Sequence, residues 1–125
     1  MKVAVLHAPL DLRLDEVPRP EIGPSDLLVK VAAAGICGTD LHFRHMGPRF
    51  AGKPMALGHE FAGEVEAGTD VPQFKLGARV AYNSNNSPAY MGRGCECGCF
   101  SNYVILRDVD THTRSLCRIP DNVSY

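Results

Sequence analysis

Glycine and proline interrupt this sequence so often that no long regular element can form. The 125 residues include 12 Gly and 9 Pro, and the apolar runs between them are short. Proline can neither donate to a sheet ladder nor continue a helix, and glycine marks turns, so this texture is typical of domains built from short strands. We therefore expect one mainly β domain over residues 1–125, with one or two short helices.

Alternation of apolar and polar residues locates the expected strands. Leu27, Val29 and Val31 share one face of a strand over 27–34. Other strands are expected over 2–6, 12–17, 59–67, 99–106 and 116–119, and after a tight turn within 74–82. Strands of this number and length predict a partly open β-barrel or a folded sheet.

The remaining segments carry weaker signals. Thr39 or Asp40 can cap a short helix over 41–45. Residues 83–98 are polar, rich in glycine and contain cysteine, which predicts a long loop. Residues 120–125 resemble the approach to a further helix.

Composition excludes several classes of function. A net charge of -1 provides no electrostatic basis for binding nucleic acid or an acidic membrane surface. No segment reaches the roughly 18 apolar residues that cross a bilayer, and the N-terminus lacks a signal-peptide pattern. The odd number of cysteines, five, suits reduced thiols, so we expect a cytoplasmic protein.

Two short segments carry the richest chemistry. Residues 35–42 read Gly-Ile-Cys-Gly-Thr-Asp-Leu-His, and residues 58–63 read Gly-His-Glu-Phe-Ala-Gly. Cys37 and His59 offer a thiolate and an imidazole, which zinc prefers, and each has a carboxylate nearby. A lone Cys is more often a buried packing residue, but the combined pattern favours half of a mononuclear zinc site.

The neighbouring carboxylates have separate expected roles. Asp40 is a candidate to orient the His59 ring through its second nitrogen. Adjacent strand residues point to opposite faces, so His59 and Glu60 can both face a metal only where the backbone is irregular. Gly58 would permit that irregularity.

Thr39 and His42 lie three residues apart, which would place them on one face of a short helix. A hydroxyl that passes the proton of a substrate alcohol to an imidazole would make a relay for alcohol oxidation. In the alternative interpretation, Thr39 only caps the helix and His42 is a solvated helix residue.

Both segments, together with residues 77–81 and 119–124, resemble the zinc-dependent medium-chain alcohol dehydrogenases. The likeness is greatest to their polyol and threonine dehydrogenase branch and covers essentially the whole chain. It matches the family's N-terminal catalytic domain, whose fold is similar to the co-chaperonin GroES.

The resemblance implies roles for individual residues. Cys37 and His59 would ligate the catalytic zinc, with Glu60 as a further or alternating ligand. Thr39 would handle the substrate hydroxyl, and His42 would end the relay. In the complete enzyme, zinc polarises the alcohol while a hydride leaves to NAD or NADP.

The family's nucleotide-binding part has no counterpart here. A nicotinamide dinucleotide needs a Gly-x-Gly-x-x-Gly turn between a strand and a helix, and these 125 residues contain none. The remaining zinc ligand of the family would also lie beyond Tyr125. We therefore expect no cofactor binding by this chain, weak zinc binding, and no turnover of an alcohol without the missing Rossmann domain.

The structural-zinc lobe of many relatives is altered. Its thiols would be Cys95, Cys97, Cys99 and Cys117, but the first three are separated by one residue rather than two. That spacing lacks the turn of a zinc knuckle, so we expect a lost lobe, free thiols and a single metal site.

Two other functions remain as alternatives to the dehydrogenase hypothesis. One is a non-enzymatic GroES-like interaction module, and the other is a zinc-free relative of the quinone reductases. Neither has a use for the pair Cys37 and His59. The partners expected for a dehydrogenase domain are a small alcohol or polyol and the missing nucleotide-binding domain, while a homo-oligomer stays open.

Overall fold

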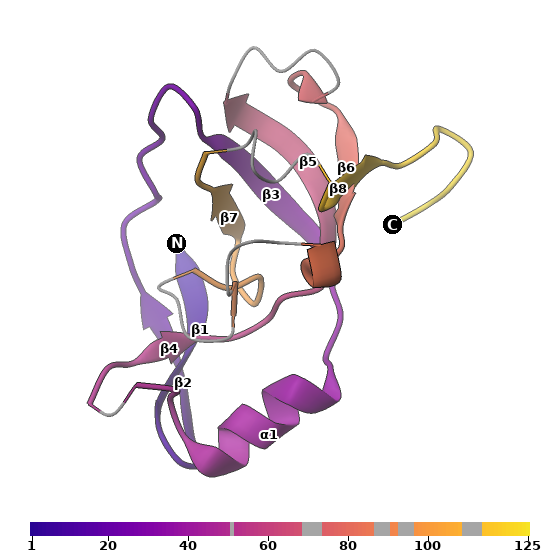
Figure 1. Ribbon diagram of the computed structural model, residues 1–125. Helices are drawn as coiled ribbons and strands as arrows, with labels where there is room; N and C mark the ends of the chain where they lie inside the picture. Colours follow the sequence, from indigo (N-terminus) through magenta and orange to yellow (C-terminus); the bar gives the residue numbers. More distant parts are fainter. Residues whose placement is uncertain (51, 69–73, 87–90, 93–96, 109–113) are drawn as a thin grey trace.

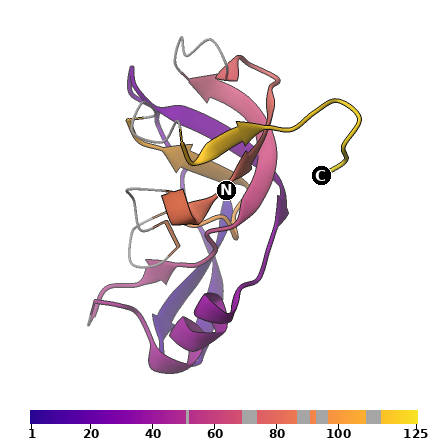
Figure 2. The same ribbon diagram turned by 45° about the vertical axis from the view of Figure 1, so that its right-hand side comes forward.

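The computed structural model describes residues 1–125 except 51, 69–73, 87–90, 93–96 and 109–113. Its strands form two antiparallel sheets, one of three strands and one of five. The helix α1 (Gly38–Met46) lies at the end of the molecule that the smaller sheet occupies (Figures 1 and 2). The predicted mainly β fold with a short helix is confirmed.

The smaller sheet has the order β2-β1-β4. Its strands are β1 (Lys2–Ala8), β2 (Asp11–Glu16) and β4 (Met55–Ala56). The first two, both predicted as strands, pair as an antiparallel hairpin in which Leu10 adopts a positive φ of 63°. Strand β4 was not predicted, because two residues are too few to show an alternating pattern.

The larger sheet has the order β7-β3-β5-β6-β8, so β7 and β8 are its edges within the described part of the chain. Its strands are β3 (Leu27–Ala34), β5 (Phe61–Gly68), β6 (Arg79–Tyr82), β7 (Tyr103–Leu106) and β8 (Leu116–Arg118). At the centre, Gly63 lies so close to β3 that a Cβ there would be 2.2 Å from the Lys30 carbonyl oxygen.

Two apolar clusters form the core, and one aromatic ring joins them. The smaller cluster consists of Leu6, Met55 and Leu57, with Phe43 of α1 packed against it. The larger cluster consists mostly of side chains from the five-stranded sheet, and Phe100 packs against both clusters. Complete burial of a side chain such as Leu6 stabilises the fold by about 1.5–3 kcal/mol.

The helix begins earlier than predicted. Cys37 is its N-cap, whereas Thr39 and Asp40 are the second and third helical residues. The reason is that the Asp40 carboxylate folds back to accept the Cys37 N–H, at 2.9 Å.

In the described residues no helix is long and apolar enough to span a bilayer.

The predicted strand over 99–106 is shorter at its start. The N–H groups of Cys99 and Phe100 donate to the carbonyl oxygens of Gly58 and Leu57, at 2.9 and 3.1 Å, rather than to β3. Regular pairing with β3 therefore begins only at Tyr103. Residues 98–100 instead run beside the segment between β4 and β5, and Ser101 bridges to Val3 of β1.

The predicted loop over 83–98 begins with a short 3-10 helix, η2 (Ser84–Asn86), and residues 87–90 and 93–96 of that loop lie outside the described residues. At the C-terminus, a turn follows β8, with the Val123 N–H bonded to the Pro120 carbonyl oxygen at 3.1 Å. The chain loops out beside the sheet (Figure 2), and its last residues contact Arg79 of β6, whose guanidinium donates to the Val123 carbonyl oxygen and lies 4.6 Å from the centroid of the Tyr125 ring.

Candidate metal centre

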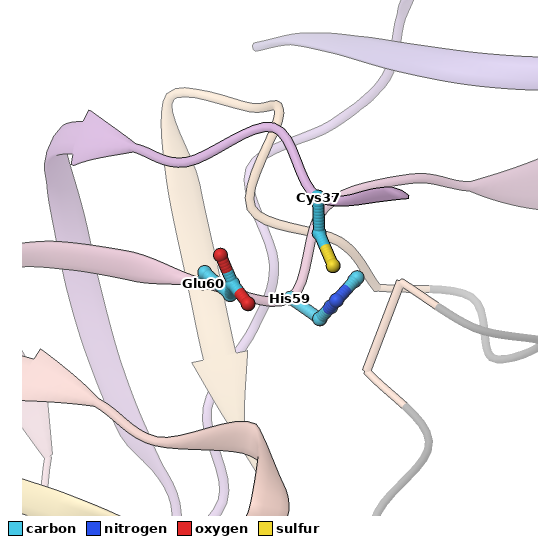
Figure 3. A group of neighbouring side chains, drawn as sticks. All are labelled: Cys37, His59 and Glu60. Carbon is cyan, nitrogen blue, oxygen red and sulfur yellow. The ribbon is translucent and has the colours of Figure 1, made fainter. Parts of the chain in front are cut away.

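Three side chains of different chemistry meet between the two sheets. Cys37, His59 and Glu60 each offer one potential ligand atom, and these atoms all lie within 4.8 Å of one another. Figure 3 shows the Cys37 sulfur directed toward the His59 ring, with the Glu60 side chain on the same side. No other group of at least three such donors occurs among the described residues.

Cys37 is held at the point where β3 has ended and α1 begins. Its backbone is extended, with φ -99° and ψ 160°, and its carbonyl oxygen accepts the Asp40 and Leu41 N–H groups. The helix start thus fixes the direction in which this half-exposed thiol points.

His59 and Glu60 lie in an irregular segment between β4 and β5, so their side chains need not point to opposite faces as adjacent strand residues do. Gly58 has a φ of +92°, and a Cβ there would be 2.7 Å from the Cys99 sulfur. The irregular backbone that a shared metal requires is therefore present. His59 is buried, whereas Glu60 is exposed.

Asp40 ties the two segments of the site together. Its side chain is buried, and its carboxylate accepts the Cys37 N–H at 2.9 Å and the Gly58 N–H at 3.2 Å. The distance from Asp40 Oδ1 to His59 Nδ1 is 3.4 Å, and Nδ1 has no hydrogen-bond partner among the described residues. The carboxylate lies beside the ring, its role in orienting that ring remains a prediction, and its two backbone bonds were not foreseen.

Thr39 and His42 occupy different surroundings. The Thr39 hydroxyl is 3.7 Å from the Cys37 sulfur, so it borders the candidate centre. His42 is exposed on α1, with its ring edge-on to Phe43. The proposed relay between them remains a prediction.

The sequence suggests Cys99 only as a ligand of a second metal, but the structure places it against the backbone of Gly58 and Glu60. Its thiol is buried and donates to the Glu60 carbonyl oxygen at 3.4 Å. Burial raises the pKa of this thiol to about 12, so it is protonated at neutral pH. Nothing in the sequence pattern indicated this contact.

The other cysteines of the altered lobe lie in different environments. Cys97 is half-buried, Cys117 is exposed on β8, and Cys95 lies outside the described residues. The Cys117 thiol donates to the Ala81 carbonyl oxygen at 3.7 Å. Among the described residues, Cys97, Cys99 and Cys117 form no donor group together, and the expected single metal site remains a prediction.

Comparison with known proteins gives a consistent result. The family model of the alcohol dehydrogenase GroES-like domain matches residues 23–121. Sorbitol dehydrogenase of Bacillus subtilis is 46% identical over 85 residues, which are 65% of this chain and 24% of that protein. L-threonine 3-dehydrogenase of Streptomyces avermitilis is 53% identical over 74 residues, 56% of this chain and 22% of that protein.

Solved structures support the same relationship over nearly the whole chain. 2R,3R-butanediol dehydrogenase from Bacillus subtilis superposes with a TM-score of 0.80 and 29% identity, over 99% of this chain and 42% of that one. Alcohol dehydrogenase TADH from Thermus sp. ATN1 gives 0.77 and 26%, over 99% and 41%. The chain thus spans less than half the length of these relatives.

Proposed function

The chain belongs to the alcohol dehydrogenase GroES-like domain family, and we propose that it supplies the zinc-binding catalytic domain of a dehydrogenase for an alcohol or polyol. The observation that carries this proposal is the meeting of Cys37, His59 and Glu60 within 4.8 Å. Relatives named for sorbitol, L-threonine and (R,R)-butanediol support a hydroxyl-bearing substrate.

Zinc is the metal that this donor set fits. Thiolate, imidazole and carboxylate are its usual ligands, and catalytic sites combine three protein ligands with one open position. The unpartnered His59 Nδ1 beside Asp40 supports the assignment, because a zinc-ligating imidazole usually directs its second nitrogen at a carboxylate or carbonyl. When bound, zinc would supply a Lewis acid that lowers the pKa of a substrate hydroxyl.

The residues around the donors would orient the substrate and move its proton. Thr39, beside Cys37, would take the proton of the substrate hydroxyl at its Oγ1 while its own hydroxyl proton passes on toward His42. His42, exposed on α1, would release that proton to solvent. Asp40 would hold both donor segments in place through its two backbone hydrogen bonds.

Hydride transfer would need a nicotinamide cofactor held outside these 125 residues. The sequence has no Gly-x-Gly-x-x-Gly turn to receive a dinucleotide. We therefore propose NAD or NADP as the cofactor of the complete enzyme, bound by a Rossmann domain, with the remaining zinc ligand of the family also supplied elsewhere and Glu60 as the alternating ligand. The reduced thiols are consistent with the cytoplasm as its compartment.

Metal binding to the purified 125-residue chain tests this function. We expect one zinc or cobalt ion per chain, and a thiolate-to-cobalt absorption band that Cys37→Ser removes. His59→Ala should weaken binding by at least 10-fold, whereas the neighbouring exposed substitution Glu64→Gln should leave it unchanged. A vicinal diol added to the cobalt-loaded chain should shift its visible absorption bands.

The same samples give the contrary outcomes. Metal binding that is indifferent to Cys37→Ser and His59→Ala would refute the site and favour an interaction module or a zinc-free reductase. Two ions per chain, one of them lost with Cys97→Ser, would restore the second zinc lobe. Oxidation of an alcohol with NAD or NADP by the isolated chain would refute the need for a separate cofactor domain.

A further inference from the structure

We propose that Cys99 is a positioning residue of the metal centre, which uses its main chain and its thiol to hold the backbone on both sides of His59. The inference rests on the proposed function, because its consequence is the geometry of the zinc donors. Cys99 is not itself a member of the donor group formed by Cys37, His59 and Glu60.

Two hydrogen bonds from Cys99 bracket His59. The Cys99 N–H donates to the Gly58 carbonyl oxygen at 2.9 Å, and the Cys99 thiol donates to the Glu60 carbonyl oxygen at 3.4 Å. The Gly35 N–H donates to the same Glu60 oxygen at 2.8 Å. The peptide unit before His59 and the peptide unit after Glu60 are therefore both held by the segment that carries Cys99.

Close packing leaves the segment around Cys99 and the segment around His59 little freedom to move relative to each other. Cys99 is 1% exposed, and its sulfur fills the space where a side chain at Gly58 would lie. On either side of the contact, a Cβ at Gly92 would be 2.0 Å from the Gly58 oxygen, and one at Gly98 would be 2.2 Å from the Leu57 oxygen.

The thiol matters for the donors because His59 lies in no strand. Strand residues are held by ladder hydrogen bonds, whereas His59 depends on bonds to its neighbours for its direction. A main-chain shift of a few tenths of an ångström at Glu60 would move both donors relative to Cys37. The weak thiol bond thus influences two ligands at once.

The test compares Cys99→Ala, which removes the donor, with Cys99→Ser, which keeps one. Orienting partners of metal ligands typically contribute 10- to 100-fold in affinity. Because this thiol acts on the ligand backbone, we expect about a 3- to 10-fold weaker zinc affinity for Cys99→Ala, with altered cobalt absorption bands. Cys99→Ser should stay within about twofold of the original chain.

Cys117→Ala is the control, because it removes the same type of thiol-to-carbonyl contact on β8, two strands away from β5 and with no bond to residues 57–60 among the contacts of the described residues. It should change neither the zinc affinity nor the cobalt bands. If Cys99→Ala does not fold, Cys99→Val replaces the volume without a donor and carries the same expectation.

The outcomes separate this inference from the proposed function. Unchanged zinc affinity and cobalt bands in Cys99→Ala overturn the inference, as does an equal loss in Cys99→Ser. If the original chain binds no zinc, the proposed function fails, and NMR of the metal-free protein decides the inference. In that case the inference requires that Cys99→Ala, but not Cys117→Ala, shifts the His59 ring signals. Unchanged signals in Cys99→Ala overturn the inference.

Discussion

Two buried aspartates hold loops of this domain together, and they differ in how their charge is matched. Asp26 accepts the Gly23 N–H at 2.7 Å and the Asp108 N–H at 3.2 Å, and Arg107 adds its guanidinium at 2.5 Å. Asp40 also accepts two backbone N–H groups, but the next polar group beside it is the unpartnered His59 Nδ1.

The contrast distinguishes a carboxylate whose charge is already paired within the protein from one that lies beside a site able to take a ligand. A buried carboxylate is stable only when hydrogen bonds and an opposite charge offset its lost hydration. Burial alone raises the pKa of Asp26, but its hydrogen bonds and Arg107 outweigh burial and leave that pKa below its usual value. For Asp40, a cation held by Cys37, His59 and Glu60 would provide the opposite charge.

The largest effect is expected from Asp40→Asn. The Cys37 and Gly58 N–H groups bond to different oxygens of the carboxylate, and an amide replaces one of these oxygens with an NH2 donor, so they cannot both keep their bonds. We expect zinc affinity to fall by about 10- to 100-fold, as measured by competition with a chelating dye. A zinc affinity within twofold of that of the original chain would show that Asp40 contributes no more to metal binding than Asp26 does.

A smaller effect on stability, with none on the metal, is expected from Asp26→Asn. Loss of the charge-assisted bonds from Arg107 and the backbone should lower the free energy of unfolding by about 1–2 kcal/mol at pH 7. Urea unfolding measures this change, and the zinc affinity of the same variant should remain unchanged. A parallel loss of zinc would contradict the separation of the two carboxylates.

The stability difference between the original chain and Asp26→Asn should depend on pH. Because the folded pKa of Asp26 lies below the unfolded value of about 3.9, its contribution is complete above that value. The difference should be lost as the pH falls below about 4 and through the folded pKa. Urea midpoints between pH 3 and 7 test this, and a gap that widens on acidification would reverse the assigned sign.

The smallest effect is expected from Arg107→Gln. The Arg107 side chain is 62% exposed, so solvent weakens its attraction for Asp26. We expect a loss of about 0.5–1 kcal/mol, less than for Asp26→Asn, because the two backbone bonds remain. A loss larger than that of Asp26→Asn would show that the guanidinium, rather than the backbone donors, dominates this contact.

The chemistry of the candidate centre could be predicted because it depends on residue types. Thiolate, imidazole and carboxylate groups such as those of Cys37, His59 and Glu60 can ligate zinc wherever they meet, and Gly58 indicated the irregular backbone that brings two adjacent residues to one site. The central strands β3 and β5 were predicted for a similar reason, since alternation is visible within a few residues.

Other features had no local signal. The start of β7 at Tyr103 and the position of Cys99 both depend on bonds to residues 57–60, about 40 positions earlier in the chain. The helix start at Gly38 depended on whether Asp40 would turn back toward Cys37 or outward to solvent. Both choices are open to an aspartate near a helix N-terminus.

By itself, the sequence determined a domain of short strands, a set of candidate metal donors and the family of the chain, because periodicity and side-chain chemistry are local. Only the tertiary structure decided which buried aspartate would be paired with an arginine. Asp26 meets Arg107 across 81 positions, and Asp40 meets Gly58 across 18. The partners of a buried charge come from distant segments, and the paths of the loops between them set which groups come within hydrogen-bonding distance.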